Sequence, residues 1–417
     1  MKKPKLMNKI HKKKNVRTDR ISAQGNKSQH DHGYTVTTAR SVKEVEEIRD
    51  IWKKIQIGPA ADIDYYLTVV NSRKQVVRPH VIILSHDKYI ESMLVGRIED
   101  MRLEFKFGYK TLFRPKVRSL TIVEGGILGN TSYTNCAALI SEVVTSLKQR
   151  EADIVSFSEI PIDSNIYKIA KKMLGFLCRD HFPTVHPHYK MTLPATIDDF
   201  LRVRKNRKRL RNEMRRLQKS CSGNVAIKIF RERGQIDEFW RDAYKISKKT
   251  YQYALGGSFV NNIETPHLLT FLADRGWLRA YILYLEEKPL AFDLGYLHKN
   301  TYYDKNTGYD PKYKKFGVGT ILLLKIIEDL CSDCHIHYID FGAGDSAEKR
   351  RFCDLKCEEA SFYIFKPKMK GVKLNAMRTI SGASQRLGKK FLTRTILKEK
   401  WEKFKRQRAE SKPNHKQ

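Results

Sequence analysis

The sequence predicts a mixed α/β protein built from two similar halves, and three observations support this prediction. The chain has 417 residues, which is more than one ordinary hydrophobic core needs. Short apolar stretches that alternate like strands are interleaved with stretches of helical spacing. Residues 77–100 and 277–300 both read as hairpins and align with each other by eye, which suggests an old duplication.

The first half is predicted over residues 33–195. Its opening helix has Val42, Val45, Ile48 and Trp52 on one stripe, the spacing of a helix packed on a core. We expect Gly125 and Gly126 to end the third long strand. The predicted strands are 34–38, 80–85, 90–97, 120–124 and 154–159, and the predicted helices are 42–55, 136–148 and 166–174.

The second half, residues 196–368, repeats this order of elements. The predicted strands are 224–230, 277–284, 289–297, 301–307, 336–341 and 360–365, and the predicted helices are 235–253, 266–273, 319–330 and 346–353. The second half therefore follows the plan β-α-α-β-β-β-α-β-α-β, and the first half follows it in outline, which predicts an α/β layer structure with a mixed sheet.

The formal net charge of +34 is concentrated in three segments. Residues 2–27 and 202–219 each hold ten Lys/Arg and one acidic residue, and residues 366–416 hold seventeen Lys/Arg and three acidic residues. The rest of the chain is close to neutral. Such segments attract polyanions, although solvated faces and tails have the same composition.

These basic segments suggest a tail, a connecting helix and a second tail. Residues 1–32 have few large apolar groups and are predicted to be disordered. Residues 196–219 predict a basic connecting helix, and residues 369–417 predict a basic amphipathic helical tail with Trp401 and Phe404 on its apolar face. Such helices can lie on an anionic membrane surface, hold RNA, or dock on the protein's own core.

The composition also bears on location. There is no run of 18 or more apolar residues, so no membrane-spanning segment is predicted. The basic N-terminal stretch is not followed by an apolar segment and does not read as a secretory signal. The seven cysteines are an odd number, so we expect reduced thiols and a cytoplasmic location, with a peripheral position at the inner membrane face as the alternative.

A glycine turn at the start of the apolar helix near residue 319 is the candidate phosphate site. The free N–H groups and the positive end of a helix hold phosphate there, and glycine lets the backbone approach closely. Gly-x-Gly alone is weak evidence, and the third glycine of dinucleotide-binding loops is missing. The predicted cofactor-binding residues are Lys314, Lys315, Phe316, Gly317, Val318, Gly319 and Thr320.

Here the sequence resembles a family. Lys314-x-x-Gly317-x-Gly319 resembles the pyrophosphate loop of GNAT-superfamily N-acyltransferases. More specifically, the chain resembles the cellulose-biosynthesis-type acetyltransferases, which are relatives of the Fem aminoacyltransferases. The sequence segments that match the family are residues 207–217, 290–291, 308–311, 317–324 and 340–345, followed by Lys349.

The resemblance implies tandem GNAT-like domains, with the cofactor loop in the second domain alone. It also implies transfer of an acyl group from acetyl-CoA or another acyl-CoA to an amine or hydroxyl, such as that of a sugar or glycan precursor. In that superfamily a backbone N–H of the strand before the loop polarises the thioester, which here means residues 307–309.

The expected site residues include one departure from the family. Its usual tyrosine is replaced by Glu348, so Glu348 or Asp345 becomes the candidate base, although either could instead cap the following helix. Tyr309 is a further catalytic candidate. The remaining candidates lie on the substrate side and are Lys349, Asp304 and Asp310, the last of which could belong only to a turn.

The cysteines and histidines do not predict a metal site. Residues 331–335 spell a haem-attachment motif, but they lie at a helix end and lack an export signal. The four cysteines between 331 and 357 could bind zinc, but their spacing is loose, and we expect buried, inert thiols instead. His80, His181, His186 and His188 fit no ligand spacing.

Two alternative functions follow from the same residues. The first is aminoacyl transfer from charged tRNA, as in the Fem relatives, which the net charge favours and the glycine loop disfavours. The second is a non-catalytic module whose basic helices hold RNA or a membrane surface.

Overall fold

The structure, a computed structural model, describes residues 33–107, 110–202, 224–250 and 264–394. Three predictions fall on other residues and lie outside the described part of the chain. These are the tail at 1–32, the greater part of the basic connecting helix at 203–219, and the apolar face of the C-terminal tail around Trp401.

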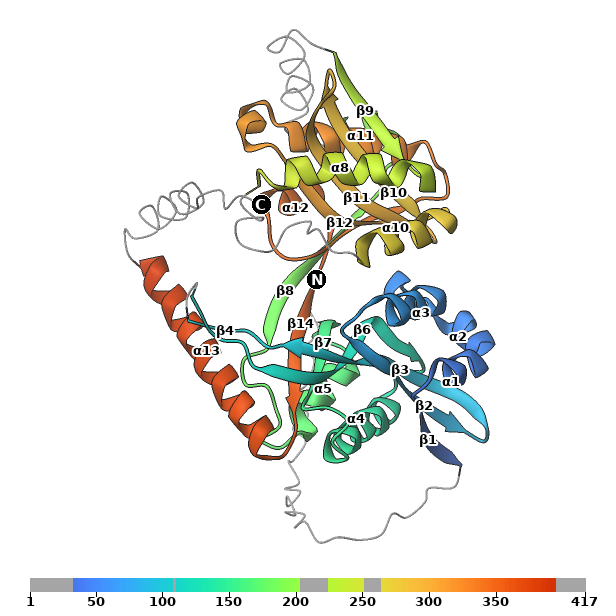
Figure 1. Ribbon diagram of the computed structural model, residues 1–417, viewed down its shortest axis with the longest axis vertical. Helices are drawn as coiled ribbons and strands as arrows, with labels where there is room; N and C mark the ends of the chain where they lie inside the picture. The colour runs from blue at the N-terminus through green and yellow to red at the C-terminus, as the bar shows by residue number, and fades with distance from the viewer. Residues whose placement is uncertain (1–32, 108–109, 203–223, 251–263, 395–417) are drawn as a thin grey trace, which may run out of the picture.

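The first half of the chain forms the lower lobe in Figure 1. Its first helix begins with a capping box, in which the Ser41 hydroxyl accepts a hydrogen bond from Glu44 N and the Glu44 carboxylate accepts one from Ser41 N. The elements are β1 Tyr34–Ala39, α1 Val42–Glu47, α2 Arg49–Ile55, η1 Pro59–Ala61, α3 Ile63–Ser72, β2 Val76–His86, β3 Tyr89–Arg102, β4 Phe105–Phe107, β5 Lys110–Phe113, β6 Lys116–Gly129, α4 Tyr133–Lys148, β7 Ile154–Pro161, α5 Asn165–Met173 and β8 Thr184–Thr192.

The second half contributes most of the upper lobe and a long C-terminal helix. The elements are α6 Ile197–Arg202, β9 Val225–Phe230, η2 Arg233–Gln235, α8 Ile236–Ser247, α10 Glu264–Asp274, β10 Leu278–Leu285, β11 Lys288–His298, β12 Thr301–Tyr309, η3 Pro311–Phe316, α11 Val318–Cys331, β13 Tyr338–Ala343, α12 Ala347–Phe352, β14 Leu355–Phe365 and α13 Met369–Arg394.

Twelve of the strands form one continuous sheet, in the order β1-β2-β3-β6-β7-β14-β8-β13-β12-β11-β10-β9. Most neighbours are antiparallel, while β6 with β7 and β12 with β13 are parallel. Strands β4 and β5 form a separate ribbon. The predicted mixed α/β fold is therefore confirmed.

The last strand of each half crosses into the other half. Strand β8, from the first half, pairs with β13, whereas β14, from the second half, pairs with β7. These two strands also pair with each other and join the lobes (Figure 1). The domain boundary between residues 195 and 196 stays a prediction, because the sheet crosses it in both directions.

The two halves have matching registers around their parallel strand pairs. Residues 119–121 of β6 pair with 154–156 of β7, and residues 301–303 of β12 pair with 338–340 of β13. One residue beyond, Ile122 lies opposite Gly96 of β3, and Asp304 lies opposite Gly295 of β11. Both registers then shift at a bulge. Ile122 and Asp304 therefore occupy corresponding positions in the two halves.

Helices cover both faces of each half of the sheet. Along β2, Ile82 and Leu84 pack with α4 and α5, whereas Val81 and Ile83 pack with α1–α3. In the second half α11 covers one face, and α8 and α10 cover the other. Alternate side chains of a strand point to opposite faces, so strands buried on both sides are nearly continuously apolar.

Three details of the sequence prediction were wrong. Gly125 and Gly126 do not end the third long strand, because β6 continues through a bulge to Gly129. The helix predicted at 42–55 is two helices, with Ile48 between them. No range was predicted for β8, whose polar sequence lacks the apolar pattern of the other strands.

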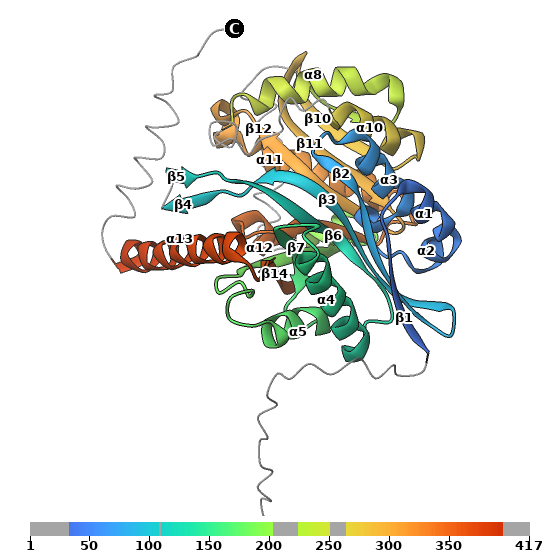
Figure 2. The same ribbon diagram turned by 60° about the horizontal axis from the view of Figure 1, so that its bottom comes forward.

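The start of α13 docks on the protein itself. Leu374 is buried with Leu103, Phe105 and Phe365, and Figure 2 shows the helix running beside the lower lobe. Further along, Ile380 and Leu387 are exposed. Among the described helices, none has the length and apolar character needed to cross a membrane.

Candidate active site

Strands β12 and β13 separate after their third residue pair, Tyr303 with Asp340. Strand β12 continues to Tyr309 along β11, while β13 continues to Ala343 along β8. Within the described strands, the edge of residues 304–309 that faces β13 therefore has no partner strand. Backbone groups at such an edge can hydrogen-bond to a ligand.

Helix α11 begins next to the end of β12, and no side chain caps its first turn. Gly317 is the N-cap residue and has the left-handed φ of 68°, which favours glycine. Ile321 N donates the first helical hydrogen bond to Gly317 O, at 2.9 Å. The N–H groups of residues 318–320 precede this bond, and together with the positive helix end they form an anion-binding arrangement.

The other predicted cofactor residues are divided between surface and core. Lys314 and Lys315 are exposed on η3 and can approach an anion at the helix start. Val318 is buried in the core, and Phe316 packs against that core, so Val318 can offer a ligand only its backbone. Thr320 is half-buried. A Cβ atom added to Gly319 would lie 3.3 Å from Cδ1 of Tyr309, which shows how closely the helix packs on β12.

Asp293 of β11 and Asp304 of β12 form a hydrogen-bonded carboxyl pair where β12 leaves β13. Asp293 is 4% exposed and accepts a hydrogen bond from the Tyr302 hydroxyl. Burial, reinforced by the charge of Asp304, raises the pKa of Asp293 far above its ordinary value. Burial also raises the pKa of Asp304 to about 6. Because two touching carboxyl groups resist double ionisation, this arrangement favours a pair that holds one proton.

Lys349 and Glu348, both on α12, lie near Asp304. The positive charge of Lys349 opposes the burial effect on the Asp304 pKa, whereas the negative charge of Glu348 adds to it. Lys349 Nζ donates hydrogen bonds to Gly342 O at 3.2 Å and Ala343 O at 2.9 Å. Burial lowers the pKa of Lys349. The structure thus brings together three residues that were predicted separately from the sequence.

Two other predicted carboxylates have structural partners. Asp345 accepts a hydrogen bond from the Tyr189 hydroxyl at 3.0 Å and forms an ion pair with Arg350. Asp310 is 1% exposed, caps η3 through Lys312 N and binds Lys249 Nζ at 2.8 Å. The contacts of Asp310 match the turn interpretation, and neither carboxylate hydrogen-bonds to the Asp293–Asp304 pair.

Helix α12 is capped by a residue that the sequence analysis did not consider for this role. The Ser346 hydroxyl accepts a hydrogen bond from Lys349 N at 3.1 Å. The idea that Glu348 or Asp345 caps this helix was therefore wrong. Glu348 is exposed on the first turn, where its carboxylate adds negative charge near Asp304.

The six cysteines in the described part of the chain are not gathered into a metal site. Among the described residues, one group of three potential ligands lies close together, and it consists of Glu159, His188 and Glu359. Cys331 Sγ donates to Pro194 O at 3.2 Å, while Cys334 and Cys357 are exposed. The expectation of buried thiols was thus wrong for these two cysteines.

Comparison with known proteins identifies the region that contains this site. Residues 204–350 match the family model of the Acetyltransferase (GNAT) domain. The chain has a GNAT-like fold, and the match includes Asp293, Asp304, the α11 start and Lys349. The matched region begins after β8 and ends before β14, so it contains neither of the exchanged strands.

The crystal structure of FemX supports the same fold. The crystal structure of FemX is 10% identical, with a TM-score of 0.52, and the similarity covers 79% of this chain and 97% of FemX. The C-terminal domain of a putative lysylphosphatidylglycerol synthetase from Agrobacterium fabrum is 10% identical, with a TM-score of 0.46, covering 81% of this chain and 97% of that domain. At this identity the FemX similarity shows the fold alone. A search of curated proteins found no match.

Sequence reasoning missed Asp293. It lies within the apolar strand PLAFDLGYL. A charged residue inside a strand buried on both faces is costly, so its presence there could have indicated a functional residue. The partnership of Asp293 with Asp304 depends on the register of β11 against β12, including the bulge at Lys305. This register was not predicted.

Proposed function

We propose that this protein is an acyl-CoA-dependent N- or O-acyltransferase of the cellulose-biosynthesis type. Its acceptor would be an amine or hydroxyl on a sugar, a glycan precursor or a related molecule of polysaccharide or cell-envelope biosynthesis. The observation that best supports the proposal is the uncapped start of α11 beside the unpaired edge of β12, within a GNAT-like fold.

In this proposal the donor binds along the unpaired edge. The pyrophosphate of acyl-CoA accepts hydrogen bonds from the N–H groups of residues 318–320, and Lys314 and Lys315 add positive charge. The thioester then lies along residues 304–309 of β12, where a backbone N–H stabilises the developing oxyanion. The protein's main contribution is to hold donor and acceptor in reacting geometry.

The Asp293–Asp304 pair supplies the base. The acceptor nitrogen or oxygen attacks the thioester carbonyl and gives its proton to the ionised Asp304 carboxylate. The carbon–sulfur bond breaks, and CoA leaves as a thiolate that takes up a proton. The Tyr302 hydroxyl donates a hydrogen bond to Asp293, and protonated Asp293 in turn holds Asp304 in position through the hydrogen bond between the two carboxyl groups.

Lys349 is proposed to bind an anionic group of the acceptor. An ammonium group has three N–H donors. Two of them reach the carbonyls of Gly342 and Ala343, so one remains for a ligand. The location of Lys349 near Asp304 would place this group beside the base.

The donor proposal is tested with Gly319→Ala. We expect acetyl-CoA and CoA to raise the melting temperature of the wild-type protein, because a ligand that binds the native state stabilises it. The added methyl group favours the helix but occupies space at the backbone, so CoA affinity should fall by roughly tenfold or more. The control is Gly234→Ala, since a Cβ atom there meets nothing within 4 Å.

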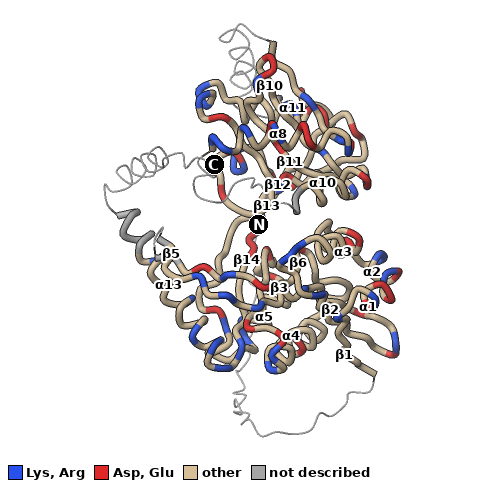
Figure 3. The backbone as a smooth tube through the Cα atoms, in the orientation of Figure 1, with Lys and Arg blue, Asp and Glu red and all other residues tan. Residues whose placement is uncertain are grey.

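A second candidate is aminoacyl transfer from charged tRNA, which the three basic segments favour. Acidic and basic residues are interspersed over both described lobes (Figure 3), so the excess positive charge belongs mainly to segments outside them. Stabilisation by tRNA with no response to any CoA ester would replace the first proposal with the second. A response to RNA or anionic vesicles that does not depend on Gly319, without transferase activity, would indicate a binding module.

A further inference from the structure

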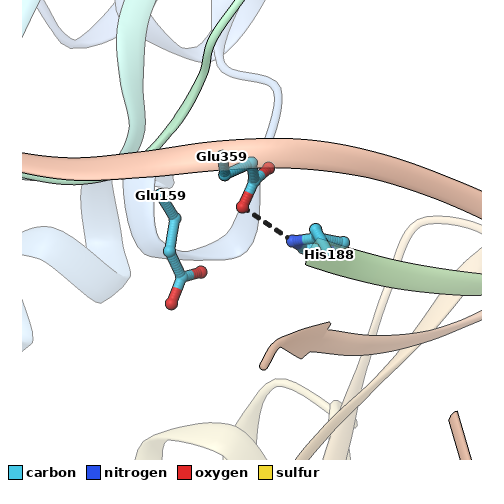
Figure 4. Close-up of side chains that lie close together, drawn as sticks. All are labelled: Glu159, His188 and Glu359. Atoms are coloured by element: carbon cyan, nitrogen blue, oxygen red, sulfur yellow. Dashed lines mark hydrogen bonds and ion pairs between the residues drawn. The ribbon is translucent and has the colours of Figure 1, made fainter. Parts of the chain in front are cut away.

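Three potential metal ligands lie where the two lobes exchange strands. Glu159 belongs to β7, His188 to β8 and Glu359 to β14. Figure 4 shows the three side chains on their separate strands, with the hydrogen bond between His188 and Glu359 dashed. Their ligand atoms all lie within 4.8 Å of one another.

The two nitrogens of His188 face different carboxylates. Nδ1 lies 2.9 Å from Oε2 of Glu359, and Nε2 lies 2.7 Å from Oδ1 of Asp340 on β13. Asp340 also accepts a hydrogen bond from Gly342 N at 2.8 Å, which fixes its carboxylate. A metal-binding histidine typically donates its second N–H to such a carboxylate, which orients the ring.

A protonated His188 explains part of this arrangement. Burial lowers its pKa, but the hydrogen bonds to Asp340 and Glu359 outweigh burial and raise the pKa to about 10. This ion pair leaves Glu159 unexplained. Its carboxylate is half-buried, makes no hydrogen bond among the described residues and lies near Glu359, and burial with the charge of Glu124 raises its pKa. The positive charges of Lys305 and His188 oppose this rise in the Glu159 pKa, but among the described residues no side chain hydrogen-bonds to both Glu159 and Glu359, whereas a metal ion between them would bind both.

We propose that Glu159, His188 and Glu359 bind a divalent transition-metal ion at the crossing of β7, β8 and β14. Nδ1 of His188 and one oxygen of each glutamate would be the ligands, with Nε2–H donating to Asp340. The proposal does not depend on the acyltransferase reaction.

The donor set selects the class of ion. One imidazole nitrogen and two carboxylate oxygens suit Zn²⁺, Mn²⁺ or Co²⁺, whereas Mg²⁺ and Ca²⁺ prefer oxygen ligands alone. Metal–ligand distances near 2.0–2.2 Å place neighbouring ligand atoms roughly 3–4 Å apart, so the observed group needs only a small contraction. Two carboxylates and a neutral imidazole also balance the charge of a divalent ion.

The experiment is isothermal titration of the chelator-treated full-length protein with Zn²⁺ and Mn²⁺, with Mg²⁺ as the comparison ion. We expect one Zn²⁺ or Mn²⁺ per chain and a rise in melting temperature. Glu159→Gln and His188→Gln should remove this binding, and Asp340→Asn should weaken it by roughly 10–100-fold. Glu159→Gln is the decisive variant, because no hydrogen bond of the described fold depends on that carboxylate.

Two controls separate this site from surface charge and from thiols. Glu358→Gln removes the same charge from the adjacent, exposed residue of β14 and should leave binding unchanged. Cys357→Ser tests the thiol that lies opposite His188 across the β8–β14 pair. Binding that survives Glu159→Gln, or that is lost in Cys357→Ser alone, would overturn the proposal. No binding of either ion to the folded wild-type protein would overturn it in favour of the His188 ion pair.

Discussion

The two halves begin their corresponding helices, α4 and α11, in opposite ways. In the first half the Ser132 hydroxyl accepts a hydrogen bond from Asn135 N, so the first turn of α4 is capped from within. In the second half Gly317 replaces the serine, and α11 has no side-chain cap. The N-terminus of this helix is thus capped by a side chain in the first half and available to an anion in the second half.

A second difference lies in the sheet beside these helices. The positions that correspond to Asp293 and Asp304 are Leu94 and Ile122 in the first half, and both are buried apolar residues. These two positions of the sheet can therefore be filled by apolar residues. A buried carboxyl pair costs stability unless something else requires it. Both departures, the open helix and the carboxyl pair, occur in the same half, which supports one working site with the first half as scaffold.

The largest expected effect comes from Asp304→Asn. Removal of a general base typically costs 10²–10⁴-fold in rate, so kcat of the acyl transfer should fall by about this factor. The amide no longer needs to ionise in a buried place, so the free energy of unfolding at pH 8 should rise, by roughly 1–2 kcal/mol. Kinetics and denaturant titration measure the two effects.

The matched control for this variant is Ile122→Val at the corresponding position of the first half. It should cost about 0.5–1.5 kcal/mol of stability and leave kcat nearly unchanged. If Asp304→Asn keeps full activity while remaining folded, the carboxyl pair is not the base, and the contrast between the halves has another cause.

A smaller effect is expected in the pH dependence. Only ionised Asp304 can accept a proton, so kcat/KM should rise about tenfold per pH unit up to about 6 and then level off. Stability changes in the opposite direction, because the folded-state pKa lies above the ordinary value of 3.8. The folded protein should lose stability as the pH rises from about 4 to 6. Both slopes should be absent in Asp304→Asn, and a slope that persists there would assign it to a different group.

The smallest effect is expected from Ser132→Ala in the first half. Loss of the cap at α4 should lower the free energy of unfolding by about 1 kcal/mol, because Asn135 N loses its side-chain acceptor. CoA affinity should not change, since this helix lies in the half without the glycine turn. A change in CoA affinity comparable to that of Gly319→Ala would show that the first half contributes directly to the donor site.

The sequence was sufficient to predict elements with strong local patterns. Helix α11 and the hairpin of β10 and β11 follow from apolar periodicity, and Gly317 follows from its place before an apolar helix. Strand β8 was missed because only two of its residues, Tyr189 and Met191, are buried, and its first half, including His186, has no alternation of apolar and polar residues. The first residues of β8 and of β14 are exposed between the lobes. They have no buried face, so their sequence lacks the alternation of apolar and polar residues by which a strand is predicted.

The contacts of the candidate site depend on the register of paired strands and on the exchange of strands between the two halves. Asp293 meets Asp304, and His188 meets Asp340, only because particular strands pair with particular offsets. A shift of one residue would turn each side chain to the other face of the sheet. Local sequence does not specify such pairings between distant segments, whereas the separate candidates Asp304, Glu348 and Lys349 could be named without them.

The exchange of β8 and β14 ties the folding of the two lobes together. Strand β7 finds its partner β14 about 200 residues further along the chain, so the sheet cannot close between the lobes until nearly the whole protein has been synthesised. Before that point β7 presents an unpaired edge, which is prone to association with other chains. A gene cut between the halves would give two fragments that each lack the final strand of their own lobe. Because each lobe depends on a strand from the other half, the two halves have to be inherited and folded as a single piece.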